Sequence, residues 1–333
     1  MNRSINLPIR DRTIDNIRGF AIFLVVVGHC IMRFYETDAA FINNYWFRLI
    51  YSFHMPLFMF VGGWVAWLTF DGTLKKLKKR ALALLIPFVV WNVVNTLYLW
   101  IIDGGWDNGY WRYLAMGQGF LWFFYSMFLC YVLLYTLLKL PETLQAVAAI
   151  VLCAFMQFVH LKIFELGLVN WYFFFFICGY FVSKYKRLNP IKNSWGLAIT
   201  LCAAGVVLGS IWHPSMLVDC PHLAFIAQNK YLLLVWRYTV PLTLIAACFS
   251  LFYMIANHWH ADRIGQTIGR YTMEIYIQNY AWICLIVRIW NDPSLYWLET
   301  AVITAVTLTS SVYLAKQIEK NKKLGFWLLG KQQ

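Results

Sequence analysis

Uncharged apolar runs recur along the whole chain, separated by short polar segments. Residues 19–32 and 53–70 contain no Lys, Arg, Asp or Glu. A helix needs about 20 mostly apolar residues to cross a bilayer, so the pattern predicts an all-α polytopic membrane protein. Ten spans are predicted: Ile17–Tyr35, Trp46–Phe70, Ala81–Ile102, Gly119–Leu138, Leu144–His160, Val169–Ser183, Trp195–Trp212, Leu232–Ile255, Thr272–Ile289 and Trp297–Ala315.

Basic residues are unevenly distributed over the segments between these spans. With the N-terminus inside, 21 of the 28 Lys and Arg fall on the cytoplasmic side. Cytoplasmic loops of membrane proteins collect Lys and Arg. The chain is therefore predicted to have both its N-terminus and its C-terminus in the cytoplasm.

Composition narrows the class of protein further. The apolar content of 61% and the mean hydropathy of +0.58 exceed what a soluble domain needs. The net charge of +13 follows from the cytoplasmic loops and predicts contact with membrane lipid, not with nucleic acid. All loops are short, so residues 1–333 are expected to form one membrane domain with no separate soluble domain. No CxxC spacing occurs among the eight cysteines, and we expect neither a disulfide framework nor a metal site.

The first span carries two ionisable side chains, Arg18 and His29. A titratable group inside hydrocarbon is costly and is therefore a functional candidate. Eleven helical steps leave the two residues about 20° apart around the helix and about 16 Å apart along it. They share a face, with Arg18 at the cytoplasmic border and His29 buried near mid-membrane. A neutral imidazole there can accept a proton or attack an acyl carbon.

Further polar residues reach similar depths in other spans. Helical rise places His54 and Asn279 near the level of His29, and Glu274 one to two turns closer to the cytoplasm. His54 also has a structural interpretation, a hydrogen bond between helices. Glu274 can likewise pair with Arg270, four residues before it. These residues are expected to support the substrate or the structure around His29.

The segment Leu74–Arg80 reads LKKLKKR and is predicted to be a cytoplasmic loop. It has two interpretations. Its charges can fix topology and contact anionic lipid. Alternatively, Lys76, Lys79 and Arg80 bind the phosphates of a cytoplasmic ligand such as CoA.

Five segments match, in chain order, the motifs of one family. They are Ile14–Phe20 continued to His29 (Arg, ten residues, His), Phe53–Gly63 (FHMPLFMFVGG), Leu121–Phe124 (LWFF), Phe174–Gly179 and Ile268–Tyr276. Together they resemble the acyltransferase family 3 membrane proteins, and the second segment resembles the fucose 4-O-acetylase-like branch. The matches run from residue 14 to about residue 280 and cover nearly the whole chain.

The resemblance implies transfer of an acyl group, commonly acetyl, from cytoplasmic acyl-CoA to a hydroxyl of a cell-envelope sugar, polysaccharide or glycolipid. It implies His29 as general base or transient acyl carrier, with Arg18 guiding the phosphate end of CoA. Trp122 and the ninth span would line the path of the thioester. No cofactor would be bound permanently, and the expected location is the cytoplasmic (inner) membrane of a bacterium.

Two positions depart from the family pattern. Related proteins often carry Arg-x-x-Arg before a proline, whereas here Arg80 is followed by Ala83 ahead of Pro87. A histidine common in the late helix is Asn279 here. The contacts to CoA therefore rest on Arg80 with Lys79 and Lys76, and the chemistry rests more heavily on His29.

Two rival functions remain open at the level of sequence. Buried His, Arg and Glu side chains also suit a transporter or flippase, in which they would form a substrate or proton path. Transporters often show inverted repeats, and the chain has no visible internal repeat. The second rival is a non-catalytic sensor or partner subunit.

Overall fold

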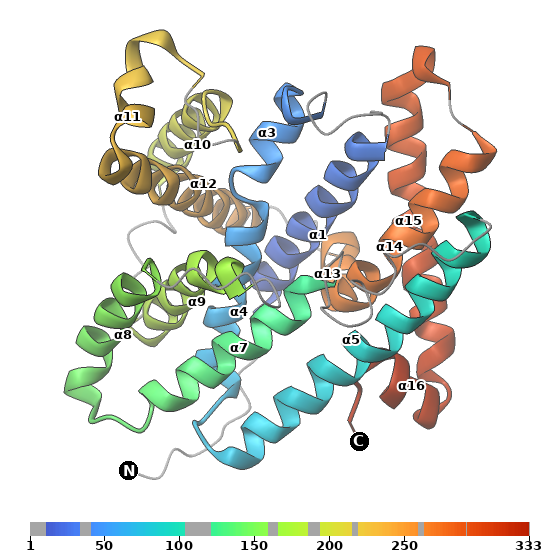
Figure 1. Ribbon diagram of the computed structural model, residues 1–333, viewed down its shortest axis with the longest axis horizontal. Helices are drawn as coiled ribbons and strands as arrows, with labels where there is room; N and C mark the ends of the chain where they lie inside the picture. The colour runs from blue at the N-terminus through green and yellow to red at the C-terminus, as the bar shows by residue number, and fades with distance from the viewer. Residues whose placement is uncertain are drawn as a thin grey trace. The chain divides into compact units, whose positions relative to one another are not determined.

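The computed structural model describes residues 11–33, 41–103, 121–158, 166–185, 194–214, 219–258, 263–290 and 292–332. All regular elements in these residues are helices, which confirms the all-α prediction (Figure 1). A helix lies over each of the ten predicted spans. The predicted ends Tyr35, Gly119 and His160 lie outside the described residues.

Five helical segments are long and apolar enough to cross a membrane. They are Arg12–Arg33, Tyr45–Thr69, Leu74–Tyr98, Lys230–Ala256 and Tyr296–Glu319. Shorter apolar helices cover Trp122–Leu137, Glu142–Met156 and Trp195–Ser210. The chain thus has the composition of a multi-span membrane protein, while the count of ten spans and the cytoplasmic termini stay predictions.

The helices divide into two compact units, each built from two stretches of chain. Unit 1 comprises Met1–Val61 and Tyr185–Thr272, and unit 2 comprises Gly62–Lys184 and Met273–Gln333. The single domain expected over residues 1–333 stays a prediction.

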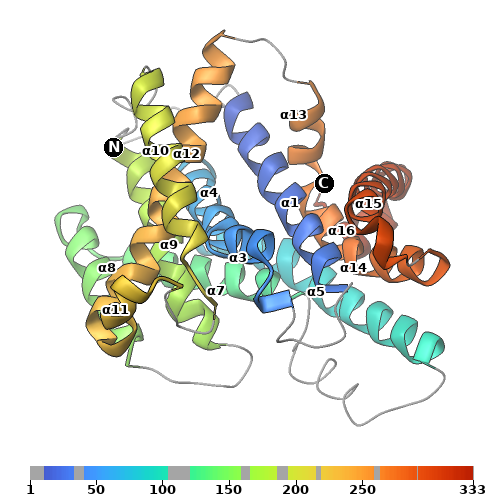
Figure 2. The same cartoon turned by 90° about the horizontal axis from the view of Figure 1, so that it is seen from above.

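Unit 1 is organised around the first helix. Its elements are α1 (Arg12–Arg33), α3 (Tyr45–Tyr51), the start of α4 (His54–Thr69), α10 (Trp195–Ser210), α11 (Ala224–Gln228), α12 (Lys230–His258) and α13 (Arg263–Arg270). Figure 2 shows α13 alongside α1. Gly19 and Gly269 allow this approach, because an added Cβ would overlap the carbonyl oxygens of Gly265 and Asp15 respectively.

The second predicted span is broken in the structure. Helix α3 ends at Tyr51 and α4 begins at His54. Pro56 has no N–H to bond the carbonyl of Ser52, so the regular hydrogen-bond pattern cannot continue through this point. At the same break, the Ser52 hydroxyl donates a hydrogen bond to the Leu49 carbonyl at 2.7 Å. The break places His54 at the first position of a helix.

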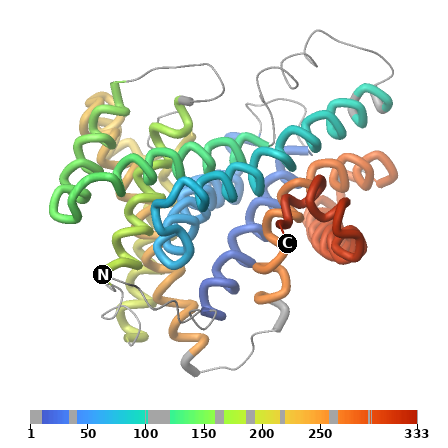
Figure 3. The backbone as a smooth tube through the Cα atoms, turned by 90° about the horizontal axis from the view of Figure 1, so that it is seen from below, coloured from blue at the N-terminus to red at the C-terminus, as the bar shows by residue number. Residues whose placement is uncertain are grey.

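Unit 2 contains the basic segment and the C-terminus. Its elements are α5 (Leu74–Asp103), α7 (Trp122–Leu137), α8 (Glu142–Met156), α9 (Leu166–Tyr185), most of α14 (Thr272–Ile289), α15 (Tyr296–Glu319) and α16 (Lys322–Leu329). Figure 3 shows the dark red α16 beside α15. The short helices α11, α13 and α16 have no counterpart in the sequence prediction.

The basic segment is helical, which corrects the expectation of a loop. Helix α5 begins at Leu74, because a tight turn before it supplies a cap. The Thr73 hydroxyl accepts a hydrogen bond from the Lys76 N–H at 3.3 Å and donates to Asp71 at 2.7 Å. Burial alone would raise the pKa of Asp71, but hydrogen bonds from Thr73 and the charge of Lys76 outweigh it and lower that pKa. The ionised carboxylate thus stabilises the turn.

The C-terminal segment is hydrogen-bonded to α5. The indole N–H of Trp91 donates to the Leu328 carbonyl at 2.7 Å, and the Gln332 amide donates to the Lys79 carbonyl at 2.8 Å. Between them Gly330 adopts a left-handed conformation with φ 65°, as a helix C-terminus favours. An added Cβ at Gly330 would overlap the Ala83 carbonyl.

Candidate functional site

Arg18 and His29 lie on one continuous helix, α1. Regular helical geometry keeps their side chains on one face. The structure corrects one expectation, because His29 is half-buried instead of buried. A half-buried imidazole is shielded from bulk solvent yet can be reached by a substrate.

Arg18 is held by neighbours within unit 1. One guanidinium nitrogen donates to the Thr272 hydroxyl at 2.7 Å, and the other lies 3.8 Å from the buried Asp15 carboxylate. Thr272 begins α14, the helix that also carries Glu274 and Asn279. The side chain predicted to guide CoA is therefore positioned by protein contacts.

The hydrogen bond of His54 lies within its own predicted span, four residues away, and does not reach a neighbouring span, contrary to expectation. The His54 side chain is 3% exposed, and Nδ1 lies 2.8 Å from the Ile50 carbonyl oxygen. A carbonyl only accepts, so Nδ1 carries the hydrogen and Nε2 of the neutral ring is an acceptor. The bond closes the break between α3 and α4.

The Tyr51 ring lies against the His54 ring and against Gly28, the residue before His29. The centres of the Tyr51 and His54 rings are 4.5 Å apart, and an added Cβ at Gly28 would lie 2.8 Å from the Tyr51 Cε2 atom. The Tyr51 hydroxyl donates to the sulfur of Met32 at 3.0 Å. We call His29, Tyr51 and His54 the histidine cluster.

Arg80 is anchored in unit 2 at the end of α4. Its guanidinium donates to the Thr69 hydroxyl at 2.6 Å and lies 5.1 Å from the centre of the Tyr131 ring. Lys76 and Lys79 on the first turns of α5 are exposed. The basic group thus combines one fixed guanidinium with accessible ammonium groups, an arrangement that suits phosphate.

Trp122 and Asn279 both pack inside unit 2. Trp122 stacks on Tyr172, with ring centres 5.0 Å apart and 22° between the planes. Asn279 is fully buried and donates to the Tyr276 carbonyl at 2.6 Å. The position where related proteins often carry histidine therefore holds an amide that bonds its own helix.

The structure gives Glu274 a different partner from the Arg270 expected from spacing. The buried Glu274 carboxylate lies 2.8 Å from the Lys331 ammonium, which also pairs with Glu319. Lys331 lies far downstream, beyond α16, so no helical spacing could predict this pair. Glu274 thus ties α14 to the C-terminal segment.

The predicted site residues fall into two groups. Arg18, His29 and His54 lie in unit 1, and Arg80, Lys76, Lys79, Trp122, Glu274 and Asn279 lie in unit 2. In the part of the chain that the structure describes, no three His, Cys, Asp or Glu side chains gather as a metal site would need.

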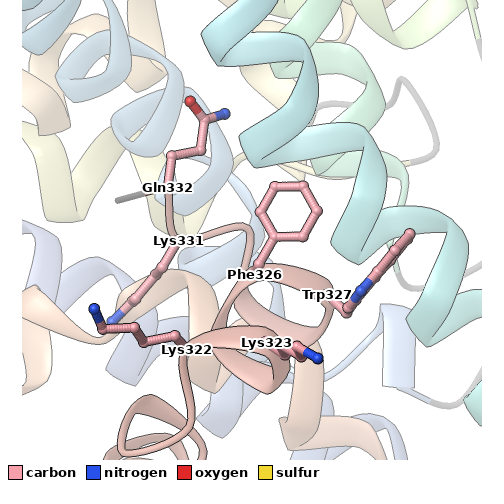
Figure 4. A pocket seen from close by; sticks show the side chains of 6 residues that line it. All are labelled: Lys322, Lys323, Phe326, Trp327, Lys331 and Gln332. Atoms are coloured by element: carbon pink, nitrogen blue, oxygen red, sulfur yellow. The ribbon is translucent and has the colours of Figure 1, made fainter.

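A basic hollow of about 330 Å³ lies next to α16 (Figure 4). Its lining consists of Lys322, Lys323, Phe326, Trp327, Lys331 and Gln332. Gln332 also bonds the Lys79 carbonyl, so one residue that lines the hollow contacts the basic start of α5. Sequence reasoning missed this feature, although the paired lysines and the Phe-Trp pair are visible in the sequence.

Comparison with known proteins identifies relatives of this chain. The family described as "Acyltransferase domain" matches residues 11–316. Nodulation protein NolL of Sinorhizobium fredii is 39% identical over 90 residues, and NolL of Mesorhizobium japonicum is 37% identical over 89 residues. Each alignment covers 25% of this chain and 23% of the relative, so the chain matches about a quarter of these curated relatives. No solved structure matches.

The family match contains every residue of the histidine cluster, the basic start of α5 and α14. It confirms the resemblance drawn from the ordered motifs and the prediction of an acyltransferase. The chain belongs to the acyltransferase family 3.

Proposed function

We propose that this protein is a membrane-bound O-acyltransferase that moves an acyl group, acetyl by preference, from cytoplasmic acyl-CoA to a hydroxyl of a cell-envelope sugar or polysaccharide. The observation that carries the proposal is the half-buried His29 on α1, with Arg18 on the same face, inside the region matched by the family. The protein would act in the cytoplasmic membrane of a bacterium as a single ten-span domain, with both termini in the cytoplasm.

The donor binds through its phosphates in this proposal. Arg80, Lys76 and Lys79 supply one fixed and two accessible cations. The hollow beside α16 adds lysines and two aromatic rings, groups that suit the phosphates and the adenine of CoA. Acyl-CoA is a substrate here and leaves after each turnover.

His29 carries the chemistry by one of two routes. As general base, Nε2 or Nδ1 takes the proton of the acceptor hydroxyl, the oxygen attacks the thioester carbonyl, and the carbon–sulfur bond breaks. The CoA thiolate then receives the proton. As acyl carrier, a ring nitrogen attacks the thioester and the carbon–sulfur bond breaks, which releases the CoA thiolate. The acceptor hydroxyl then attacks the acyl-imidazole, the carbon–nitrogen bond breaks, and the hydroxyl proton ends on the thiolate. Both routes yield an ester and free CoA.

Replacing Arg80 with alanine should weaken acyl-CoA binding about tenfold, because one charge-assisted contact to phosphate is lost. Titration of the purified protein with acetyl-CoA measures this effect. Arg288→Ala is the matched control. This exposed arginine lies in the last turn of α14, at the end that is predicted to face away from the cytoplasm. Equal affinities of the two variants for acetyl-CoA would reject Arg80 as a phosphate contact.

A transporter and an acyltransferase give different results in proteoliposomes. An acyltransferase releases CoA thiol from acetyl-CoA when a sugar acceptor is present. A transporter or flippase moves the sugar without consuming the thioester. Thiol release that depends on the sugar supports the proposal, and sugar movement without thiol release contradicts it.

A further inference from the structure

A half-buried arginine in the last turn of α3 contacts the segment after α10 in unit 1. The side chain of Arg48 is 12% exposed and pairs with the carboxylate of Asp219. The backbone N–H of Asp219 donates to the Ile211 carbonyl at 2.9 Å. The Arg237 guanidinium on α12 lies 5.7 Å from the centre of the Trp212 ring. We call Arg48, Trp212, Asp219 and Arg237 the arginine–tryptophan cluster.

Two buried N–H groups of this cluster lack an acceptor among the residues that the structure describes. They are Nε of Arg48 and Nε1 of Trp212, whose side chain is 5% exposed. Native proteins satisfy nearly all such groups, because a buried N–H without an acceptor is strongly unfavourable. Within the part of the chain that the structure describes, both groups thus remain able to donate to an oxygen atom of a ligand.

The remaining groups of the cluster define the chemistry of that ligand. Asp219 is 58% exposed and accepts hydrogen bonds. Burial and the charge of Arg48 lower the pKa of the adjacent His213, and the charge of Asp219 acts in the opposite direction. A sugar hydroxyl both donates and accepts, and it satisfies a carboxylate and N–H donors together.

The cluster lies close to the histidine cluster within the same unit. Arg48 precedes Tyr51 by three residues on α3, which is one helical turn. The Tyr51 ring packs against Gly28 and His54, next to His29. On the proposed function, we infer that the arginine–tryptophan cluster is the acceptor subsite, which binds a hydroxyl-rich sugar so that one of its hydroxyls reaches His29.

The test uses the full-length protein in nanodiscs, with acetyl-CoA as donor and a panel of p-nitrophenyl glycosides as acceptors. Trp212→Phe removes only the indole N–H and should raise the KM for the acceptor about fivefold, the worth of one hydrogen bond. Arg48→Lys keeps the charge beside Asp219 but loses Nε, and it should act in the same direction. The KM for acetyl-CoA should stay within about twofold of the wild-type value.

Trp195→Phe is the matched control, because Trp195 is an exposed residue at the other end of α10. It should leave both KM values unchanged. An unaltered acceptor KM in Trp212→Phe and Arg48→Lys, with transfer by the wild type intact, would overturn the subsite alone. A wild type that transfers acetyl to no glycoside would overturn the proposed function and the subsite with it.

Discussion

Replacing His29 with alanine is expected to lower acetyl transfer by at least about 100-fold, the usual contribution of a positioned general base. If His29 carries the acyl group, the loss should be complete, because the first covalent step disappears. No other histidine stands on the shared face with Arg18, and the late helix has Asn279 where relatives often have a second histidine. The measurement is the release of CoA thiol by purified protein in the presence of a sugar acceptor.

Two controls make this result specific to chemistry. His222→Ala alters an exposed histidine in the short helix Pro221–Leu223 and should keep wild-type turnover. Thermal unfolding of His29→Ala in detergent should match the wild type, since the side chain is only half-buried. A folded His29→Ala protein with the wild-type transfer rate would remove His29 from the mechanism.

Replacing Gly269 with alanine is expected to destabilise the protein by about 3 kcal/mol. An added Cβ would overlap the carbonyl oxygen of Asp15, which belongs to the backbone of α1 and cannot rotate away. The helices α1 and α13 would have to separate, and Asp15 is also the ion-pair neighbour of Arg18. Thermal unfolding in detergent measures the loss, and transfer should fall as Arg18 shifts.

Gly196→Ala is the matched control for this substitution. Gly196 also lies in a helix, but its nearest neighbour to an added Cβ is the Ser194 hydroxyl at 3.9 Å. Alanine has the higher helix propensity at both positions, so the difference between the variants isolates the close approach of α13 to α1. Similar unfolding temperatures for the two variants would contradict the tight packing of these helices.

The apolar pattern predicted the long helices because their signal is local. An uncharged run of about 20 residues is legible without knowledge of its neighbours, and a helix lies over every run identified in this way. The pattern missed the break at Ser52, which depends on the missing N–H of Pro56. It also misjudged the start of α5, because Thr73 and Asp71 cap a helix whose first turns are strongly basic.

The candidate site was also predictable only in part, because the sequence shows local spacing but not the contacts between helices. Arg18 and His29 share a helix, so their common face follows from spacing. Other contacts of the site form only in the folded protein, and a single sequence does not reveal them. They are the ion pair of Glu274 with Lys331, the packing of Tyr51 against His54 and the ion pair of Arg48 with Asp219. Half-burial of His29 likewise depends on neighbours from other helices.

The most direct test of the central claim is to identify the product. Purified protein is incubated with isotope-labelled acetyl-CoA and a defined glycan acceptor, and the glycan is then analysed by mass spectrometry before and after mild alkaline treatment. The account predicts one labelled acetyl group on the glycan, released by alkali as an oxygen ester is, in amounts equal to the free CoA formed. An unmodified glycan together with intact acetyl-CoA, from protein that is folded and membrane-inserted, would contradict it.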